Sequence, residues 1–192
     1  KKSLGILLVG VLVFLCLATT VSAETFKNKS DSGTYKADET PYGTADVSWN
    51  YDANTATLTL SGHGTFNKPD EKPWQKYNDF VKHLVISQSI STGYPHLPRK
   101  IDDVTIICEN NCTMFYDIKA ETITIDGNGV FTVDLDISDK GTLFTNLSKS
   151  KHMIISDNIT EIRQAEEGGL LFPDNLIIGK NLKSIDGFAP HE

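Results

Sequence analysis

The chain has 192 residues, a formal net charge of −7 and a hydrophobic content of 39%. This length suits one domain with a single core. Its 18 Lys and Arg residues against 25 Asp and Glu residues argue against nucleic-acid binding, because neutralising phosphates requires clustered positive charge.

Residues 1–23 have the pattern of a secretory signal peptide. Lys1 and Lys2 precede an apolar stretch over 4–18, and Val21-Ser22-Ala23 offers small residues for cleavage. The apolar stretch is shorter than the ~20 residues that span a bilayer, which favours a cleaved leader over a membrane anchor. We therefore expect a secreted protein, extracellular or at the cell surface, with no transmembrane anchor after signal cleavage.

Two segments follow the leader before the repeats begin. Residues 24–45 are polar without a sustained period and are interpreted as a lead-in with little packing of its own. Residues 46–80 are predicted to form a β-rich N-terminal cap. Here apolar and polar residues alternate on both sides of a turn at Asp52-Ala53-Asn54, which predicts a hairpin with one buried face. Trp49 and Trp74 are interpreted as sealing the core, whereas Tyr42, Tyr51, Tyr77 and Tyr94 are equally compatible with a binding surface.

Residues 81–189 are predicted to form degenerate leucine-rich-type repeats, followed by a tail at 190–192. The motifs at 152–162 and 175–185 align with an offset of 23 residues, within the range of leucine-rich repeats. A third motif at 84–90 stands three such periods earlier, and short strands are predicted at 104–107, 122–125 and 131–137. The expected fold is mainly β: a leucine-rich-repeat-type β-solenoid with an N-terminal hairpin cap and few helices.

The cysteines and glycosylation motifs fit an exported protein. Cys16 lies in the leader, so Cys108 and Cys112 remain as a pair across a turn-forming Glu-Asn-Asn, which predicts a disulfide. A metal site is the weaker alternative, since no second pair stands at ligand spacing. Four sequons are candidate N-glycosylation sites in a eukaryotic host and carry no such meaning in most bacterial ones: Asn28, Asn111, Asn146 and Asn158.

Motifs for catalysis are weak throughout the sequence. Asp134 and Asp136 alternate with apolar residues and are interpreted as the solvated face of a strand. The segment 126–129, Asp-Gly-Asn-Gly, resembles a calcium loop but lacks the later Glu, which favours a hairpin turn. No nucleophile, zinc or phosphate-loop motif is present. We therefore predict no catalytic residue, no metal, no cofactor and no enzymatic activity.

The motifs together resemble the BspA-like branch of the leucine-rich-repeat surface proteins. The resemblance rests on Trp49, the Thr57–Gly64 run, Pro73-Trp74 and the Lys180–Ile185 phrase, and covers about 46–90 and 151–189. It implies a secreted or cell-surface location and adhesion, through binding of host matrix glycoproteins, other cells or further copies. The chain departs from the family in having only two or three clear repeats.

The expected function is an adhesin-like, non-catalytic interaction module for an extracellular protein or glycan. No contact residue is singled out, but six positions are expected to line one side of the repeat sheet: Lys82, Thr105, Glu121, Thr124, Lys151 and Asn175. One alternative is a carbohydrate-active enzyme on a β-solenoid, using carboxylates such as Asp102, Asp103 or Asp126. Another is a self-assembling structural surface component, since the final repeat carries no recognisable polar cap and could associate with another copy.

Overall fold

The computed structural model describes residues 27–39, 43–65, 71–91, 97–133, 150–164 and 173–186. The predicted leader, the tail at 190–192 and the acidic residues at 134–136 lie outside these ranges. The described part contains thirteen strands and two 3-10 helices of three residues each, η1 (Gln75–Tyr77) and η2 (Glu109–Asn111). The expected mainly-β class with few helices is confirmed.

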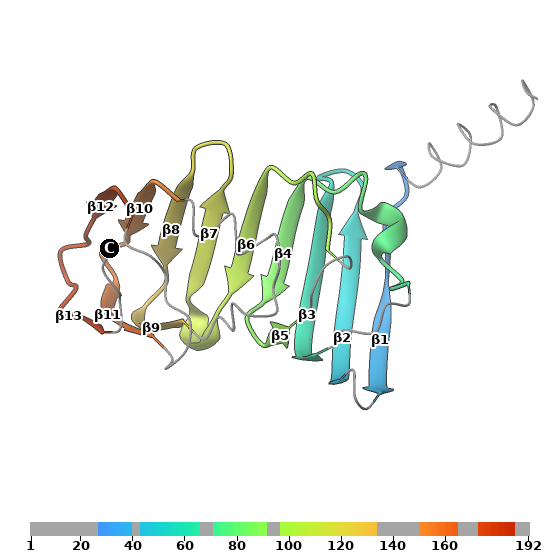
Figure 1. The fold of residues 1–192 in the computed structure, drawn as a ribbon, viewed down its shortest axis with the longest axis horizontal. Coiled ribbons are helices and arrows are strands. Elements are labelled where there is room, and N and C mark those ends of the chain that lie inside the picture. The colour runs from blue at the N-terminus through green and yellow to red at the C-terminus, as the bar shows by residue number, and fades with distance from the viewer. Residues whose placement is uncertain are drawn as a thin grey trace, which may run out of the picture.

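Ten of the strands form one mixed sheet, and three form a second, parallel sheet. The large sheet has the order β1-β2-β3-β4-β6-β7-β8-β10-β12, with β5 beside β3 (Figure 1). Its strands are β1 (Asp31–Glu39), β2 (Gly43–Asp52), β3 (Thr57–Thr65), β4 (His83–Ser87), β5 (Ile90–Ser91), β6 (Asp103–Ile107), β7 (Thr113–Asp117), β8 (Thr122–Asp126), β10 (His152–Ile155) and β12 (Asn175–Ile177). The small sheet contains β9 (Gly129–Val133), β11 (Ile159–Gln164) and β13 (Ser184–Asp186), with β11 in the middle.

Strand β1 corrects the interpretation of residues 24–45 as a lead-in with little packing. All nine residues of β1 pair in antiparallel register with β2. Tyr35 and Ala37 pack against the core, while Ser32, Thr34 and Lys36 are exposed. A strand with so few apolar residues gives little periodic signal in the sequence, and its long pairing with β2 stabilises it instead.

The predicted hairpin of the cap is confirmed as β2 and β3. Tyr51 lies opposite Leu58 and Trp49 opposite Leu60, and all four side chains are buried. The segment 71–82, which contains η1, packs on this buried side. Trp74 and Tyr77 are buried there, and the rings of Tyr51 and Tyr77 stack with centroids 4.4 Å apart. Both tryptophans are therefore core residues, as interpreted, and Tyr51 and Tyr77 are buried as well.

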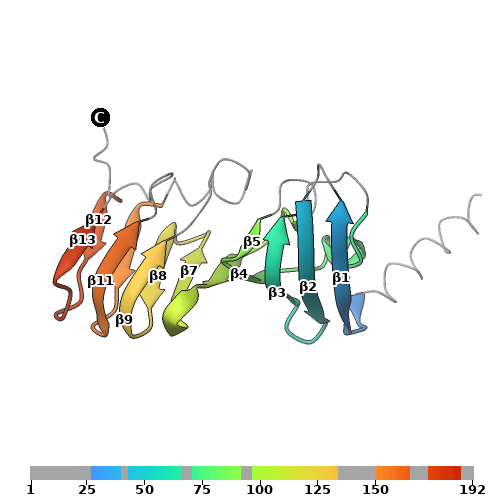
Figure 2. The same cartoon turned by 90° about the horizontal axis from the view of Figure 1, so that it is seen from below.

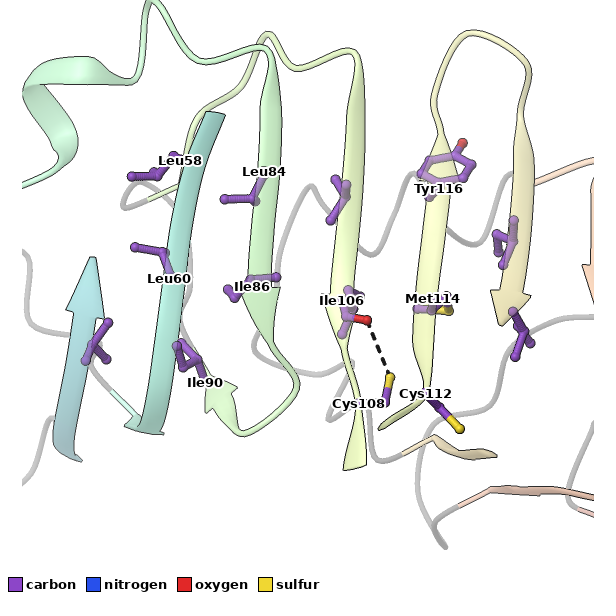
Figure 3. Close-up of a cluster of buried hydrophobic side chains, with 14 of the residues drawn as sticks. Leu58, Leu60, Leu84, Ile86, Ile90, Ile106, Cys108, Cys112, Met114 and Tyr116 are labelled. Atoms are coloured by element: carbon purple, nitrogen blue, oxygen red, sulfur yellow. Dashed lines mark hydrogen bonds between the residues drawn. The ribbon is translucent and has the colours of Figure 1, made fainter. Parts of the chain in front are cut away.

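The 23-residue offset between the two aligned motifs equals the sequence separation of paired residues in neighbouring C-terminal strands. His152 pairs with Asn175 in the large sheet and Ile162 with Ile185 in the small sheet, both in parallel strands. Inward-facing side chains of successive strands form continuous rows, part of which Figure 3 shows.

Strand β7 interrupts this parallel arrangement and was not predicted. It runs antiparallel to both β6 and β8. The chain reverses between β6 and β7 through a turn of five residues, 108–112, and so short a link cannot make the crossover that parallel strands need. The predicted turn at 126–129 is also not a hairpin, because it joins β8 to β9 in the other sheet.

A glycine in β3 permits close approach of two backbones. Gly62 has φ +118°, and a Cβ there would lie 2.2 Å from the carbonyl oxygen of Asp46. We expect Gly62→Ala to lower the free energy of unfolding by about 2 kcal/mol or more, measured by urea denaturation. Gly129→Ala is the matched control, because its φ is +84° but a Cβ would meet nothing within 4 Å. If both variants lost the same free energy of unfolding, the close approach of Gly62 to Asp46 would not be the cause of the loss.

Candidate functional site

The side of the large sheet opposite its core, here called the outer face, carries aligned rows of side chains. In β4, Leu84 and Ile86 are buried, while His83, Val85 and Ser87 point the other way and are partly exposed. Strand pairing aligns such positions across the sheet. The middle row of the outer face consists of Asn50, Thr59, Val85, Thr105, Phe115, Thr124, Ile154 and Ile177.

Phe115 is the most distinctive member of the middle row. Its side chain is 37% exposed although β7 is hydrogen-bonded to strands on both sides. Thr105 and Thr124 lie directly opposite it on β6 and β8, and Ile107, 42% exposed, is a diagonal neighbour on β6. The centre of the outer face therefore presents an aromatic ring and an aliphatic side chain among threonine hydroxyl and methyl groups.

A second row beside the middle row is acidic. It consists of Asp52, Thr57, His83, Asp103, Asp117, Thr122, His152 and Asn175. His83 Nδ1 lies 2.7 Å from Asp103 Oδ2, and Asp117 is the cross-strand neighbour of Asp103. Neither row contains Lys or Arg. The charge of these two rows therefore favours a cationic partner over an anionic one.

Of the three carboxylates proposed for an enzyme, Asp126 lies apart from Asp102 and Asp103, which are neighbours in the chain. Asp102 lies 4.0 Å from the ammonium group of Lys82, whereas Asp103 interacts with His83. Asp126 ends β8, four residues from Thr122, which shares the acidic row with Asp103. At ~3.3 Å per residue the separation along the strands is about 13 Å, beyond the spacing of a glycosidase pair. Within the described ranges, no group of three or more His, Cys, Asp or Glu could hold a metal ion.

Three of the six positions expected to line one side of the repeat sheet lie on the outer face. Thr105 and Thr124 flank Phe115, and Asn175 ends the acidic row. Lys82, Glu121 and Lys151 instead immediately precede β4, β8 and β10. Among these, Lys151 Nζ and Glu121 Oε2 form an ion pair of 2.5 Å.

Sequence reasoning missed Phe115 because it missed β7. The available signal was the alternation in Thr113–Asp117, in which Met114 and Tyr116 are buried and Phe115 is not. Placing Phe115 beside Thr105 and Thr124 depends on two antiparallel pairings that local periodicity does not determine.

The two cysteines lie opposite each other at the β6–β7 turn without a disulfide bond between them. The backbone N–H of Cys108 donates to the carbonyl oxygen of Cys112 at 2.9 Å. Their sulfur atoms point apart, that of Cys108 towards the Ile106 carbonyl and that of Cys112 towards the Val130 carbonyl (Figure 3). Burial raises the pKa of the Cys112 thiol. The predicted bridge is not formed in this structure, and pairing of the two thiols stays a prediction.

Three of the four sequons fall within the described ranges, and their asparagines are exposed. Asn28 precedes β1, Asn111 ends η2, and Asn158 lies in the turn between β10 and β11. Asn146 lies outside the described ranges. Glycosylation at these positions stays a prediction.

A polar cluster joins the segment 71–82 to β1. Asp31 Oδ2 accepts hydrogen bonds from the Tyr77 hydroxyl at 2.6 Å and from Lys76 Nζ at 3.0 Å. The bond from Tyr77, then that from Lys76, lowers the pKa of the Asp31 carboxyl from 3.8 to about 2. The cluster therefore holds the segment 71–82 against β1.

This cluster predicts a pH-dependent contribution to stability. Because the folded pKa of Asp31 is depressed, its contribution is fully present above about pH 4 and is lost as the pH falls towards about 2. We expect Asp31→Asn to cost about 1 kcal/mol at pH 7 and almost nothing at pH 2, measured by denaturant unfolding. Asp46→Asn is the control, since its ion pair with Lys36 is more exposed. A cost that persists unchanged at pH 2 would contradict this assignment.

Comparison with protein-family models, with curated proteins and with solved structures finds no match to this chain. The resemblance to BspA-like proteins thus stays an expectation based on the motifs alone. In the part of the chain that the structure describes, no helix is long and apolar enough to cross a membrane.

Proposed function

We propose that the chain is a secreted or cell-surface, adhesin-like interaction module without catalytic activity, whose outer face binds an extracellular protein. In this proposal the cap and the degenerate leucine-rich-type repeats form one β-solenoid. The parallel pairing of β10 with β12 and of β11 with β13 at one common offset supports that architecture.

The observation that carries the binding proposal is the exposed Phe115 in the middle of the outer face. Aromatic side chains are enriched among the residues that dominate binding energy at protein interfaces. Thr105 and Thr124 lie beside it on the neighbouring strands. Their hydroxyl groups offer hydrogen bonds to a partner, and their methyl groups offer apolar contacts. Phe115 would be the anchor, and its neighbours would exclude water around it.

The acidic row narrows the class of partner. Asp103 and Asp117 are cross-strand neighbours, so one Lys or Arg of the partner would contact both carboxylates. A basic protein surface fits this arrangement better than an acidic glycan does. The carbohydrate-active alternative has no comparable support, because Asp126 lies apart from the other two carboxylates, and Asp102 and Asp103 already contact Lys82 and His83.

The test is binding of the protein purified after secretion from cells that express the full chain. A panel would contain purified basic and acidic matrix glycoproteins and a neutral and acidic glycan array, with a heat-unfolded sample as control. We expect saturable, fold-dependent binding to a basic protein that weakens as salt concentration rises. Binding to glycans alone would contradict the proposal that the partner is a protein. Absence of binding by a folded sample would contradict the proposal that the chain is an interaction module.

A further inference from the structure

The last strands of the two sheets, β12 and β13, form a second feature of interest, here called the C-terminal edge. Both lie at the same end of the molecule (Figures 1 and 2). Each pairs on one side only among the described residues, β12 with β10 and β13 with β11. Two strand edges are therefore presented side by side, one in each sheet.

Comparison with the preceding repeat shows what this edge lacks. Ile155 is 2% exposed, whereas Ile178, which stands 23 residues later, is 54% exposed. Met153 and Ile162 are fully buried, but their counterparts Leu176 and Ile185 are only partly buried. One further layer of strands would cover these side chains as this repeat covers the previous one.

The backbone of β12 is also oriented for pairing at this edge. The N–H of Asn175 donates to the carbonyl oxygen of Lys151 at 2.9 Å, on the side of β10. Successive N–H groups of a strand point to opposite sides, so that of Leu176 points away from β10. A strand edge with available backbone groups and apolar side chains is a template for another strand.

Contacts to the preceding repeat hold the edge in place. Asn181 donates from its side-chain amide to the carbonyl oxygen of Asp157 at 2.8 Å, and the backbone N–H of Lys180 donates to the Asp157 carboxylate at 3.0 Å. Gly179 packs so closely on Ser156 that a Cβ would lie 2.2 Å from its carbonyl oxygen. The edge is thus ordered before any partner binds, which lowers the entropic cost of pairing.

We propose that the C-terminal edge pairs with the same edge of a second copy of this chain, about a twofold axis that passes between the two Leu176 residues. A partner at this edge must pair with β12 and β13 at the same time. Its own two strands must therefore be as far apart as β12 and β13 are. Among the described residues, the opposite end of the molecule offers a strand to one sheet only, because β1 belongs to the large sheet. A second C-terminal edge matches both strands by symmetry.

The pairing that results is antiparallel in both sheets. Leu176 of one copy lies opposite Leu176 of the other and exchanges two backbone hydrogen bonds with it, and Asn175 lies opposite Ile177. The charged residues of 173–186 balance, with Asp174 and Asp186 against Lys180 and Lys183, so like charge does not oppose the approach. Strands of three residues bury a small area, so the dimer forms only at raised concentration.

The experiment measures the mass of the secreted protein by sedimentation at rising concentration, with circular dichroism to verify folding. We expect a monomer that converts to a dimer, and a loss of affinity of about tenfold or more for Ile178→Lys, which replaces an exposed apolar side chain at the contact by a charge that loses water on pairing. Ile107→Lys is the matched control, because Ile107 is similarly exposed but lies on the outer face. A wild-type monomer at all concentrations, equal effects of both variants, or oligomers that grow beyond a dimer would overturn the proposal.

A cross-linking measurement covers the case in which Ile178→Lys fails to fold. Proteins carrying Asn175→Cys and Ile177→Cys are mixed and oxidised. The antiparallel register predicts a disulfide-linked dimer from the mixture and little from either protein alone. A parallel register would give the reverse, and no linked dimer at any concentration would exclude the pairing. Both measurements detect association of the chain with itself and need neither Phe115 nor a ligand, so failure of the ligand panel leaves this result interpretable.

Discussion

Replacement of Trp74 by alanine is expected to lower the free energy of unfolding by about 3 to 5 kcal/mol. Trp74 is fully buried, and its ring meets that of Tyr35 edge to face, with centroids 5.8 Å apart. Truncation removes the largest fully buried side chain of the described residues and leaves a cavity between the segment 71–82 and β1. Since small domains have only about 5 to 15 kcal/mol of net stability, the variant should unfold at clearly lower urea concentration.

Phe115→Ala is the matched control for this measurement. Its aromatic ring is partly exposed on the outer face, so its removal creates no closed cavity and should cost much less. Trp74→Phe should recover part of the loss, because it refills some of the volume. A loss of less than about 1 kcal/mol for Trp74→Ala would show that the segment 71–82 does not pack on the sheet as the structure has it.

The cap was predictable because its signals are local. Alternation on both sides of the turn at Asp52-Ala53-Asn54 places Trp49, Tyr51, Leu58 and Leu60 on one face, and the structure buries all four. The 23-residue offset was predictable for a similar reason, since Met153 and Leu176 occupy equivalent places in adjacent strands. Repetition of a short motif fixes register without knowledge of the remainder of the fold.

The outer face was less predictable because long-range pairing creates it. Strand β1 is polar in sequence and becomes a strand by pairing with β2. Strand β7 breaks the expected parallel order, and its direction decides that Phe115 stands between Thr105 and Thr124. Thr105 and Thr124 were expected on one side of the repeat sheet, but the aromatic residue between them was not. A one-residue change in register would have buried Phe115 and exposed Met114 and Tyr116.

Phe115→Ala is expected to weaken binding of whichever panel protein the chain recognises by about 30-fold or more, equivalent to about 2 kcal/mol. The physical reason is that a central aromatic ring buries a large area on binding, whereas the small side chains around it mainly exclude water. The loss of affinity should appear as faster dissociation, measured by surface plasmon resonance. The ring forms its contacts after the two proteins have met and does not contribute to their long-range attraction.

Two further variants separate the contributions to this binding. Asp117→Asn removes one charge from the acidic row and should lower the association rate and its salt dependence, with a smaller effect on dissociation. Ile178→Lys changes the C-terminal edge alone and should leave the affinity of the monomer unchanged. If Phe115→Ala bound as tightly as the wild type while Ile178→Lys lost binding, the contact surface would be the C-terminal edge and the assignment of the outer face would be wrong.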